Sequence, residues 1–330
     1  MKKLSKDLVD LQNYLRQQGW LKPHEQIASV AVPGEGNMNF TLRIDTGQET
    51  FIIKQSRDYV EKYPQVAAPQ ERVLREAEFY ELIKTEPLLN RMMPTIIGLD
   101  KANSVMAMED LGTGSDYTYL YKKGNTIDEQ ELFDIITFVA TLHRSFDSNS
   151  VASPLQNRKM RALNHEHIFL YPYLSNNGLD LDQILPGLKK IGTSFSKDAV
   201  LKSKVEQLGK DYLADGNTLL HGDYFPGSWL KTANGIKIID PEFCFFGFPE
   251  FEMGVTIAHL KMADQPQKLI DNALVHYQTL AKLDNDLCAK FTAIEIIRRL
   301  LGLAQLPLEI NLTKRRELLE ISRECLLRNP

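Results

Sequence analysis

Two aspartates in the stretch LLHGDYFPGSWLKTANGIKIIDPEF (219–243) could together act on a phosphate group. Asp223 follows a His-Gly dipeptide, and Asp240 precedes a Pro-Glu dipeptide seventeen residues later. The intervening Asn234-Gly235 is a strong short-range signal for a β-hairpin. A hairpin would present both carboxylates at a fixed separation, one to orient an attacking hydroxyl and one to bind Mg²⁺ through oxygen.

Two further oxygen-bearing residues extend this pattern. Protein-kinase-type sites contain a catalytic-loop aspartate, an amide ligand five positions later, and a metal-binding aspartate after a hairpin. Ser228 stands at the amide position, and Glu242 adds a second carboxylate beside Asp240. We therefore expect Asp223 to be catalytic and Asp240, Glu242 and Ser228 to lie at a metal. Taken alone, His-Gly-Asp is more often a simple turn, and Asp-Pro can merely end a strand.

A polar, glycine-rich turn near the N-terminus could bind phosphates. Gly34, Gly36, Asn37 and Asn39 lie between two expected strands, where backbone N–H groups can approach an anion. An ordinary hairpin turn would explain the same residues. The Walker pattern is absent, so a P-loop type of nucleotide site is not expected.

A lysine inside an apolar strand is the next candidate. Lys54 lies in FIIKQ, at the position where kinases hold the lysine that binds the α- and β-phosphates. Its other interpretation is a solvent-facing residue on an exposed strand. Glu76, on the helix that follows, is the expected ion-pair partner, with Glu71 and Glu78 as alternatives.

The elements that must position these residues change character along the chain. Residues 1–25 begin with an amphipathic helix, and short alternating runs then predict strands at 29–32, 40–44, 50–55 and 104–111, with a helix over 69–84. Residues 1–110 are therefore expected to form a small mixed nucleotide-binding lobe. Residues 111–330 are expected to form a larger catalytic lobe with helices at 129–146, 197–214, 266–282, 285–304 and 313–327.

The composition is that of an ordinary globular protein. The sequence is 43% hydrophobic and 25% charged, with a net charge of −4, which argues against a nucleic-acid or membrane-surface protein. It contains no run of eighteen apolar residues, and its three cysteines match no metal-binding spacing. A cytoplasmic setting is therefore expected.

Five stretches resemble a known group of proteins. They are GEGNMNFTLRI (34–44), IIKQSRDYV (52–60), MRALNHEHIFLYPY (160–173), HGDYFPGSWL with DPEFCFFGFPEFEMG (221–230 and 240–254), and IIRRLLGLAQ (296–305). Together they resemble the aminoglycoside phosphotransferase and choline kinase-like superfamily of small-molecule kinases, most closely its 5-methylthioribose kinase branch. The likeness extends from residue 34 to about residue 305.

The resemblance implies an α+β, two-lobed, protein-kinase-like fold. A small N-terminal antiparallel β lobe with one helix would bind ATP under residues 34–39. A larger, mainly helical C-terminal lobe would bind the acceptor. Adenine would bond to the backbone near Glu109 and Leu111.

The resemblance also implies roles for single residues. Asp223 would be the catalytic base, and Asp240 and Glu242 would carry Mg²⁺ while Ser228 only supports them. Trp229 lies beside this site in the sequence and is a candidate substrate contact.

An adjacent pair of arginines would approach the acceptor or the transferred phosphate. Arg298 and Arg299 lie in an expected helix, where neighbours are about 100° apart, so only one of them should easily face a ligand. A solvated basic pair is the alternative.

The predicted function is ATP- and Mg²⁺-dependent phosphorylation of a hydroxyl on a small polar molecule, foremost a methylthioribose-like sugar. Choline, aminoglycosides and homoserine remain alternative acceptors, because Glu250 and Glu252 could form an acidic pocket for a cation. A non-catalytic nucleotide-binding module is a further alternative. The family likeness also suggests a homodimer.

Overall fold

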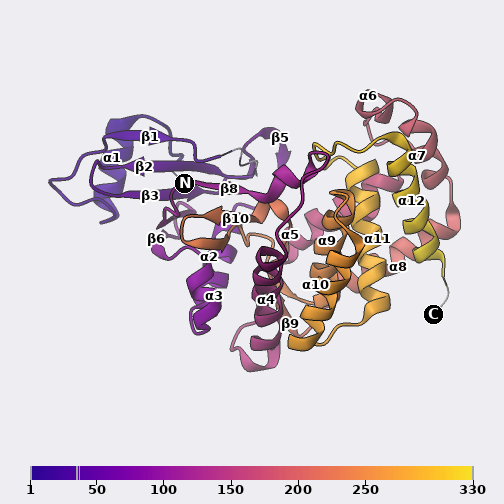
Figure 1. The fold of residues 1–330 in the computed structure, drawn as a ribbon. Coiled ribbons are helices and arrows are strands. Elements are labelled where there is room, and N and C mark those ends of the chain that lie inside the picture. The colour runs from indigo at the N-terminus through magenta and orange to yellow at the C-terminus, as the bar shows by residue number, and fades with distance from the viewer. Residues whose placement is uncertain (1, 35, 37, 329–330) are drawn as a thin grey trace. The chain divides into compact units, whose positions relative to one another are not determined.

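The computed structural model describes residues 2–34, 36 and 38–328. The chain divides into two compact units, shown in Figure 1. The N-terminal unit comprises Met1–Ser115 and Leu230–Cys244, and the C-terminal unit comprises Asp116–Trp229 and Phe245–Pro330. The sequence-based boundary at 110/111 assigned the central hairpin to the second part of the chain. The structure instead groups it with the first, because its strand β10 (Trp229–Thr232) pairs with β8 (Gly114–Asp116).

The N-terminal unit is built on a five-stranded antiparallel sheet with the order β1-β2-β3-β7-β6. Its strands are β1 (Ser29–Ala31), β2 (Phe40–Asp45), β3 (Thr50–Gln55), β6 (Ile96–Asp100) and β7 (Val105–Glu109). Smaller strands form the hairpin β4 (Tyr59–Val60) and β5 (Tyr63–Ala67), and β11 (Gly235–Ile238) completes the three-stranded sheet with β10 and β8. The strands predicted at 29–32, 40–44, 50–55 and 104–111 are present, and each end differs by at most two residues.

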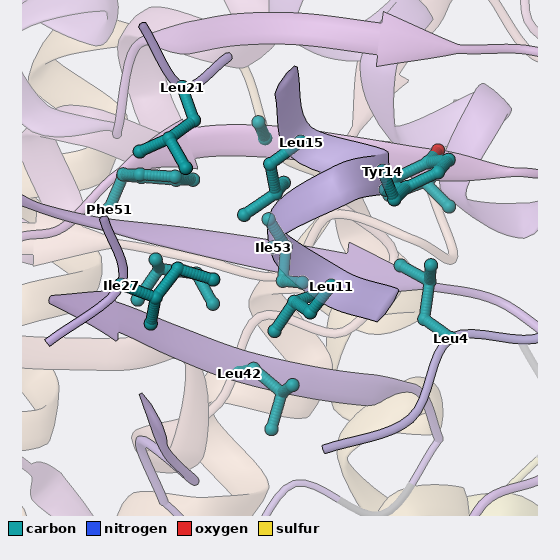
Figure 2. Close-up of a cluster of buried hydrophobic side chains, with 12 residues drawn as sticks. Leu4, Leu11, Tyr14, Leu15, Leu21, Ile27, Leu42, Phe51 and Ile53 are labelled. Atoms are coloured by element: carbon teal, nitrogen blue, oxygen red, sulfur yellow. The ribbon is translucent and has the colours of Figure 1, made fainter. Parts of the chain in front are cut away.

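Helix α1 (Leu8–Gln17) packs its apolar side on this sheet. Figure 2 shows Leu11 and Leu15 of the helix among sheet residues such as Leu42 and Ile53, all of which are buried. The Asp7 side chain begins the helix by accepting a hydrogen bond from the backbone N–H of Asp10. The same unit contains α2 (Arg72–Ile83) and α3 (Pro87–Met92), so it carries a short helix beyond those expected.

The C-terminal unit is mainly helical. Its longer helices are α4 (Glu129–Ser145), α8 (Ala199–Leu213), α9 (Pro249–Met262), α10 (Gln267–Leu280), α11 (Asn285–Leu301) and α12 (Leu312–Leu327). Shorter segments are η1 (Tyr117–Tyr121), η2 (Ser148–Ser150), α5 (Arg158–His165), η3 (Glu166–Leu170), η4 (Tyr171–Tyr173), α6 (Leu181–Ile184), α7 (Leu188–Ser196) and η5 (Pro226–Ser228). Strands β9 (Thr218–Leu220) and β12 (Phe245–Gly247) form an antiparallel pair. No helix in the described ranges is long and apolar enough to cross a membrane.

Two pairs of helices form the core of this unit. Helix α9 packs along α11, and α4 packs along α10 (Figure 1). Nearly all of α9 is buried, including the polar side chains of Glu250, Glu252, Thr256 and His259. The five helices expected in this part of the chain are present, whereas α9 was not predicted.

Candidate functional site

Lys54 of β3 forms the centre of a buried ion cluster in the N-terminal unit. Its Nζ lies 2.7 Å from Glu76 Oε2 and 2.6 Å from Asp240 Oδ1. The Lys54 side chain is only 5% exposed, so its interpretation as a solvent-facing residue is wrong. Among the three glutamates considered, Glu76 is the partner, while Glu78 pairs with Arg75 instead.

The charges around Lys54 keep it protonated. Burial alone would lower the pKa of Lys54, but the carboxylates of Asp240 and Glu76 outweigh burial and raise the pKa above its usual value. Burial raises the pKa of Glu76 in turn, and the nearby Lys54 charge opposes that rise. Lys54 is therefore a permanently charged donor held in place by two carboxylates.

Asp240 differs from its partners in exposure and in backbone conformation. Its side chain is 52% exposed, whereas Glu76 is completely buried. Its φ of 64° lies in the left-handed region, which aspartate and asparagine adopt more readily than most residues. Strain of this kind concentrates at functional sites, and here it sets the direction of a carboxylate that also reaches solvent.

Asn39, Arg72 and Glu242 form a second group of contacts in the same unit. Asn39 Nδ2 donates to Glu242 Oε2 at 2.7 Å, and Asn39 Oδ1 accepts from Arg72 Nε at 2.8 Å. Arg72 Nε also lies 3.5 Å from Glu242 Oε2. We call the six side chains of these two groups the lysine cluster: Lys54, Glu76, Asp240, Glu242, Arg72 and Asn39. In this arrangement the Asn39 side chain bonds to the protein through both ends of its amide, and the predicted approach of its backbone to a phosphate stays a prediction.

The two glycines of the glycine-rich turn are exposed. A Cβ built on Gly34 or Gly36 would meet no atom of the described residues within 4 Å. Packing within the protein therefore does not require glycine at either position. Asn37, predicted as a nucleotide contact, lies outside the described residues.

Glu109 and Leu111, expected near adenine, lie at the end of β7 and just after it. The Glu109 carboxylate accepts a hydrogen bond from the backbone N–H of Thr95, which ties β7 to the start of β6. Leu111 is half-buried. Its neighbour Asp110 forms an ion pair with Arg43 of β2, with 2.7 Å between Asp110 Oδ2 and Arg43 Nε.

The donor set of the lysine cluster suits a hard cation only in part. Half-exposed Asp240 offers carboxylate oxygen, which Mg²⁺ prefers, but Oε2 of Glu242 already accepts from Asn39. Among the described residues, no group of three or more His, Cys, Asp and Glu side chains could hold a metal. Protein sites for Mg²⁺ often supply one or two carboxylates and leave the remaining positions to water and substrate phosphates, and Asp240 with Glu242 fits that pattern.

The loop that carries Asp223 is held by hydrogen bonds to a buried residue of the C-terminal unit. Glu252 of α9 is fully buried and accepts from the backbone N–H groups of His221, at 3.0 Å, and Gly222, at 2.7 Å. Gly222 has a φ of 85°, a conformation that glycine adopts without strain. His143 Nε2 lies 3.0 Å from the same glutamate. Glu252 therefore fixes the backbone just before Asp223.

Ser228 braces the same loop from its other end. Its hydroxyl donates to the backbone carbonyl of Asp223 at 2.7 Å, and its side chain is buried. In this structure the hydroxyl supports the loop, and the expected place of Ser228 at a metal stays a prediction.

Arg298 and Arg299 are both buried, so their interpretation as a solvated basic pair is wrong. They also converge on one carboxylate, and the expectation that only one of them easily faces a ligand stays a prediction. Arg299 Nε lies 2.6 Å from Glu295 Oε1, and Arg298 Nη1 lies 3.1 Å from Glu295 Oε2. The pairing is possible because Glu295 lies one helical turn earlier on α11, within reach of both positions.

The same glutamate binds His259, which also contacts Tyr121. His259 Nε2 lies 3.2 Å from Glu295 Oε1, and its Nδ1 lies 2.6 Å from the Tyr121 hydroxyl. A carboxylate can only accept, so Nε2 carries the proton and Nδ1 accepts from Tyr121. We call these five residues the arginine cluster: Tyr121, His259, Glu295, Arg298 and Arg299.

Burial and charge fix the ionisation of the arginine cluster. Burial lowers the pKa of His259 to about 4, so this ring is neutral near pH 7. Burial would raise the pKa of Glu295, but Arg298 and Arg299 outweigh it and hold that pKa well below its usual range. For Arg299, Glu295 and Asp223 overcome the effect of burial and raise the pKa, which indicates that Asp223 lies within the electrostatic range of this cluster.

Trp229, predicted as a substrate contact, is fully buried. Its ring packs against Tyr117 and Tyr224, with centroid separations of 6.2 and 5.6 Å. With no accessible surface, Trp229 contributes to the core of the C-terminal unit instead of presenting a surface to a ligand.

Three buried charged residues were missed or given another role in the sequence analysis. Arg72 and Glu295 lie in helices and were not singled out, because isolated charges on a helix usually face solvent. Glu252 was considered only as part of an acidic pocket. No one-dimensional signal distinguishes such buried charges from surface ones, except their position next to the recognised motifs.

A buried lysine–glutamate pair on an antiparallel sheet, with His-Gly-Asp and Asp-Pro-Glu motifs on either side of a hairpin, defines a kinase-like fold. The chain belongs to the phosphotransferase enzyme family, whose model matches residues 30–284.

Curated relatives and a solved structure extend this assignment. The chain is 27% identical to a methylthioribose kinase of Exiguobacterium sibiricum, in a match that covers 71% of this chain and 61% of the relative. It is 26% identical to a methylthioribose kinase of Pectobacterium atrosepticum, with 76% and 64% covered. The chain thus spans less than two thirds of the length of these relatives. The crystal structure of LicA, a choline kinase from Streptococcus pneumoniae, in complex with AMP shares the fold, with a TM-score of 0.57, 14% identity, and 98% of this chain and 99% of that chain covered.

Proposed function

We propose that this protein is an ATP- and Mg²⁺-dependent kinase that phosphorylates a hydroxyl of a small polar metabolite. The observation that carries the proposal is the buried Lys54, held by Glu76 and Asp240 in a member of the phosphotransferase enzyme family. Two carboxylates that hold one lysine fix its Nζ as a donor for phosphate oxygens. A purely structural lysine would not need a half-exposed partner such as Asp240.

In this proposal the N-terminal unit binds the nucleotide. Lys54 binds phosphate oxygens, and the backbone of the turn that contains Gly34 and Gly36 approaches them from its open side. The backbone from Glu109 to Leu111 binds adenine. Asp240 and Glu242 hold Mg²⁺, which when bound would neutralise charge on the phosphates.

The C-terminal unit supplies the groups that act on the acceptor. Asp223 orients the acceptor hydroxyl and takes its proton as the oxygen bonds to the γ-phosphorus. The bond from that phosphorus to the bridging oxygen of ATP breaks, and ADP leaves. Glu252 and Ser228 keep the Asp223 loop in place during this step. The main contribution of the protein is positioning, because phosphoryl transfer requires little covalent chemistry from side chains.

We propose a neutral sugar resembling methylthioribose as the acceptor. The similarity to methylthioribose kinases supports this choice, and so does the charge near Asp223. Arg298 and Arg299 are matched by Glu295 and Asp223, which leaves no excess negative charge to attract a cation. Glu250 and Glu252, considered earlier as an acidic pocket, bind backbone N–H groups inside the unit.

A cationic acceptor is the second candidate, and the shared fold with a choline kinase is the observation that favours it. Homoserine and aminoglycosides belong to the same alternative, because each carries an amine. We further propose that the protein acts in the cytoplasm on a small molecule, and that it forms a homodimer. Gel filtration with light scattering tests the last point.

An ADP-release assay over a panel of acceptors tests the function. Methylthioribose and other pentoses are compared with choline, homoserine and an aminoglycoside, each with and without Mg²⁺. We expect Mg²⁺-dependent ADP release with a pentose, and loss of that release in Asp223→Asn. Release with only a cationic acceptor would overturn the choice of acceptor. Tight ATP binding without release for any acceptor would support a nucleotide-binding module instead.

A further inference from the structure

Arg72, the first residue of α2, is completely buried and has every N–H of its guanidinium occupied. All five of these donors have acceptors in the N-terminal unit. Nε donates to Asn39 Oδ1, while Nη1 and Nη2 donate to four backbone carbonyls, those of Arg57, Pro69, Met38 and Tyr59. The distances run from 2.6 to 3.2 Å. One side chain thus links the end of the glycine-rich turn, the segment after β3, and the start of α2.

The same guanidinium connects these hydrogen-bonded segments to the Asp-Pro-Glu motif. Glu242 Oε2 lies 2.7 Å from Asn39 Nδ2 and 3.5 Å from Arg72 Nε. Residues 39 and 242 are 203 positions apart in the sequence, yet their side chains share a buried hydrogen bond. Asn39 acts as the bridge, accepting from Arg72 with one end of its amide and donating to Glu242 with the other.

Stability of the fold alone does not explain this arrangement. A buried, hydrogen-bonded charge pair is often no more stabilising than well-packed apolar side chains of the same volume. A planar guanidinium with five donors in fixed directions does hold its acceptors at defined positions. Here that geometry joins the glycine-rich turn to the Asp-Pro-Glu motif, two segments that the proposed function assigns to one nucleotide site.

We propose that Arg72 is a positioning residue that, through Asn39 and Glu242, couples the glycine-rich turn to the Asp-Pro-Glu motif. The inference rests on the proposed function for its kinetic consequence, but the coupling itself is a property of the nucleotide-free protein. Asn39 then serves as an anchor of the turn, and Glu242 is pre-oriented by the turn before any metal binds. Replacement of Arg72, Asn39 or Glu242 therefore loosens both the glycine-rich turn and the Asp-Pro-Glu motif.

Hydrogen exchange of the nucleotide-free full chain tests the coupling without reference to activity. In Asn39→Ala we expect backbone amides of both residues 36–40 and residues 242–245 to exchange at least tenfold faster than in the natural protein. Amides of β3 and α11 should be unchanged, which shows that the variant is folded. Arg75→Gln is the matched control, since Arg75 lies one turn along α2, is partly exposed and pairs with Glu78. Faster exchange in only one of the two segments, or in neither, would overturn the proposal.

Arg72→Lys separates charge from geometry. Lysine keeps the positive charge beside Glu242 but replaces the planar fork with three donors on one nitrogen. We expect the same paired increase in exchange, smaller than for Arg72→Met, together with a rise of at least fivefold in KM for ATP. KM for the acceptor should stay within twofold. Unchanged exchange in both variants would contradict the positioning role.

The two proposals fail in different ways. If no acceptor is phosphorylated, the hydrogen-exchange measurements still decide whether the turn and the motif are coupled. If kinase activity is present but Asn39→Ala and Arg72→Lys exchange and bind ATP like Arg75→Gln, the coupling is wrong and the function stands.

Discussion

The lysine cluster and the arginine cluster are both buried networks around a few charges, but their charge balance differs. In the lysine cluster, Lys54 and Arg72 share three carboxylates, one of which is half-exposed. In the arginine cluster, Arg298 and Arg299 share the single carboxylate of Glu295, and Asp223 lies within its electrostatic range. An excess of carboxylate suits a divalent cation with its phosphates, whereas a balanced group suits an uncharged polyol. This difference supports the proposal that the N-terminal unit binds the metal and nucleotide and that the C-terminal unit binds the acceptor.

The largest effect expected is from Asp223→Asn, which removes the proposed base without changing size. Turnover should fall by about 10²–10⁴-fold, the usual contribution of a positioned acid or base. MgATP affinity should stay within about twofold, because Asp223 belongs to the C-terminal unit and not to the lysine cluster. Steady-state kinetics and titration calorimetry measure the two quantities. Retained turnover with collapsed ATP affinity would reverse the assignment of roles.

Glu295→Gln tests the arginine cluster by its stability. Glu295 is buried, and its loss would leave two buried guanidinium groups without their main counter-charge. We expect the free energy of unfolding to fall by about 3 kcal/mol, as when one partner of a buried pair is removed. Urea unfolding measures the change, with the exposed Glu320→Gln on α12 as a control. Equal stability of the two variants would contradict a charge-bearing role for Glu295.

The pH dependence of stability tests the neutral form of His259. Its pKa is lowered by burial from 6.5 to about 4. Between these pH values His259 is protonated in the unfolded chain but neutral in the folded protein. Stability is therefore lost as the pH falls through this window, by about 3 kcal/mol from this residue at pH 4. His259 faces Tyr121, Glu295, Arg298 and Arg299, and Glu295 remains ionised in this range because its own pKa is lowered. Urea unfolding at several pH values measures the free energy of unfolding, which should depend less steeply on pH in His259→Gln than in the natural protein. An identical pH dependence in the two proteins would refute the assignment.

Asp240→Asn addresses the cation in the lysine cluster. Asparagine tolerates the left-handed backbone at this position, so the variant should fold while losing the carboxylate. We expect MgATP affinity to fall about tenfold, or about 1.4 kcal/mol, and the gain in affinity that Mg²⁺ provides to become smaller. Calorimetry with and without Mg²⁺ measures this. A variant whose affinity gains as much from Mg²⁺ as that of the natural protein would exclude Asp240 as a metal ligand.

The smallest effect concerns the glycine-rich turn. The Cβ added in Gly36→Ala would meet no atom within 4 Å among the residues that the structure describes, and Gly36 has no left-handed backbone to strain, so stability should change by less than about 1 kcal/mol. ATP affinity should nevertheless fall a few-fold if the turn approaches phosphates. Gly178→Ala is the opposite control. Gly178 lies in another loop, far along the chain, and its φ of 78° makes alanine unfavourable there. Unchanged ATP affinity in Gly36→Ala would remove this turn from the nucleotide site.

Much of the N-terminal unit could be predicted from local patterns. The alternation of FTLRI and TFIIKQ gave β2 and β3 almost to the residue, and the order of elements led to Glu76 as the partner of Lys54. Period-2 and helical patterns are reliable wherever one face of an element is buried and the other is solvated. The Asn-Gly turn gave the hairpin β10–β11 for the same kind of local reason.

Elements and contacts that depend on the whole fold could not be predicted in this way. Helix α9 is buried around most of its circumference, so its sequence carries no amphipathic period. Burial of Arg72, Glu295 and Trp229 is decided by residues distant in sequence, and it reversed the interpretation of Trp229 as a ligand contact. Asn39 bonds to Glu242 across 203 positions, a contact that no local pattern indicates.

The most direct test of the account is ³¹P NMR of a reaction that contains the full chain, MgATP and methylthioribose. The account predicts a new phosphomonoester resonance on the sugar, formed in step with ADP, and absent with Asp223→Asn. A phosphomonoester on choline or an aminoglycoside, with none on methylthioribose or any other neutral sugar, would contradict the assignment of the balanced arginine cluster to an uncharged acceptor.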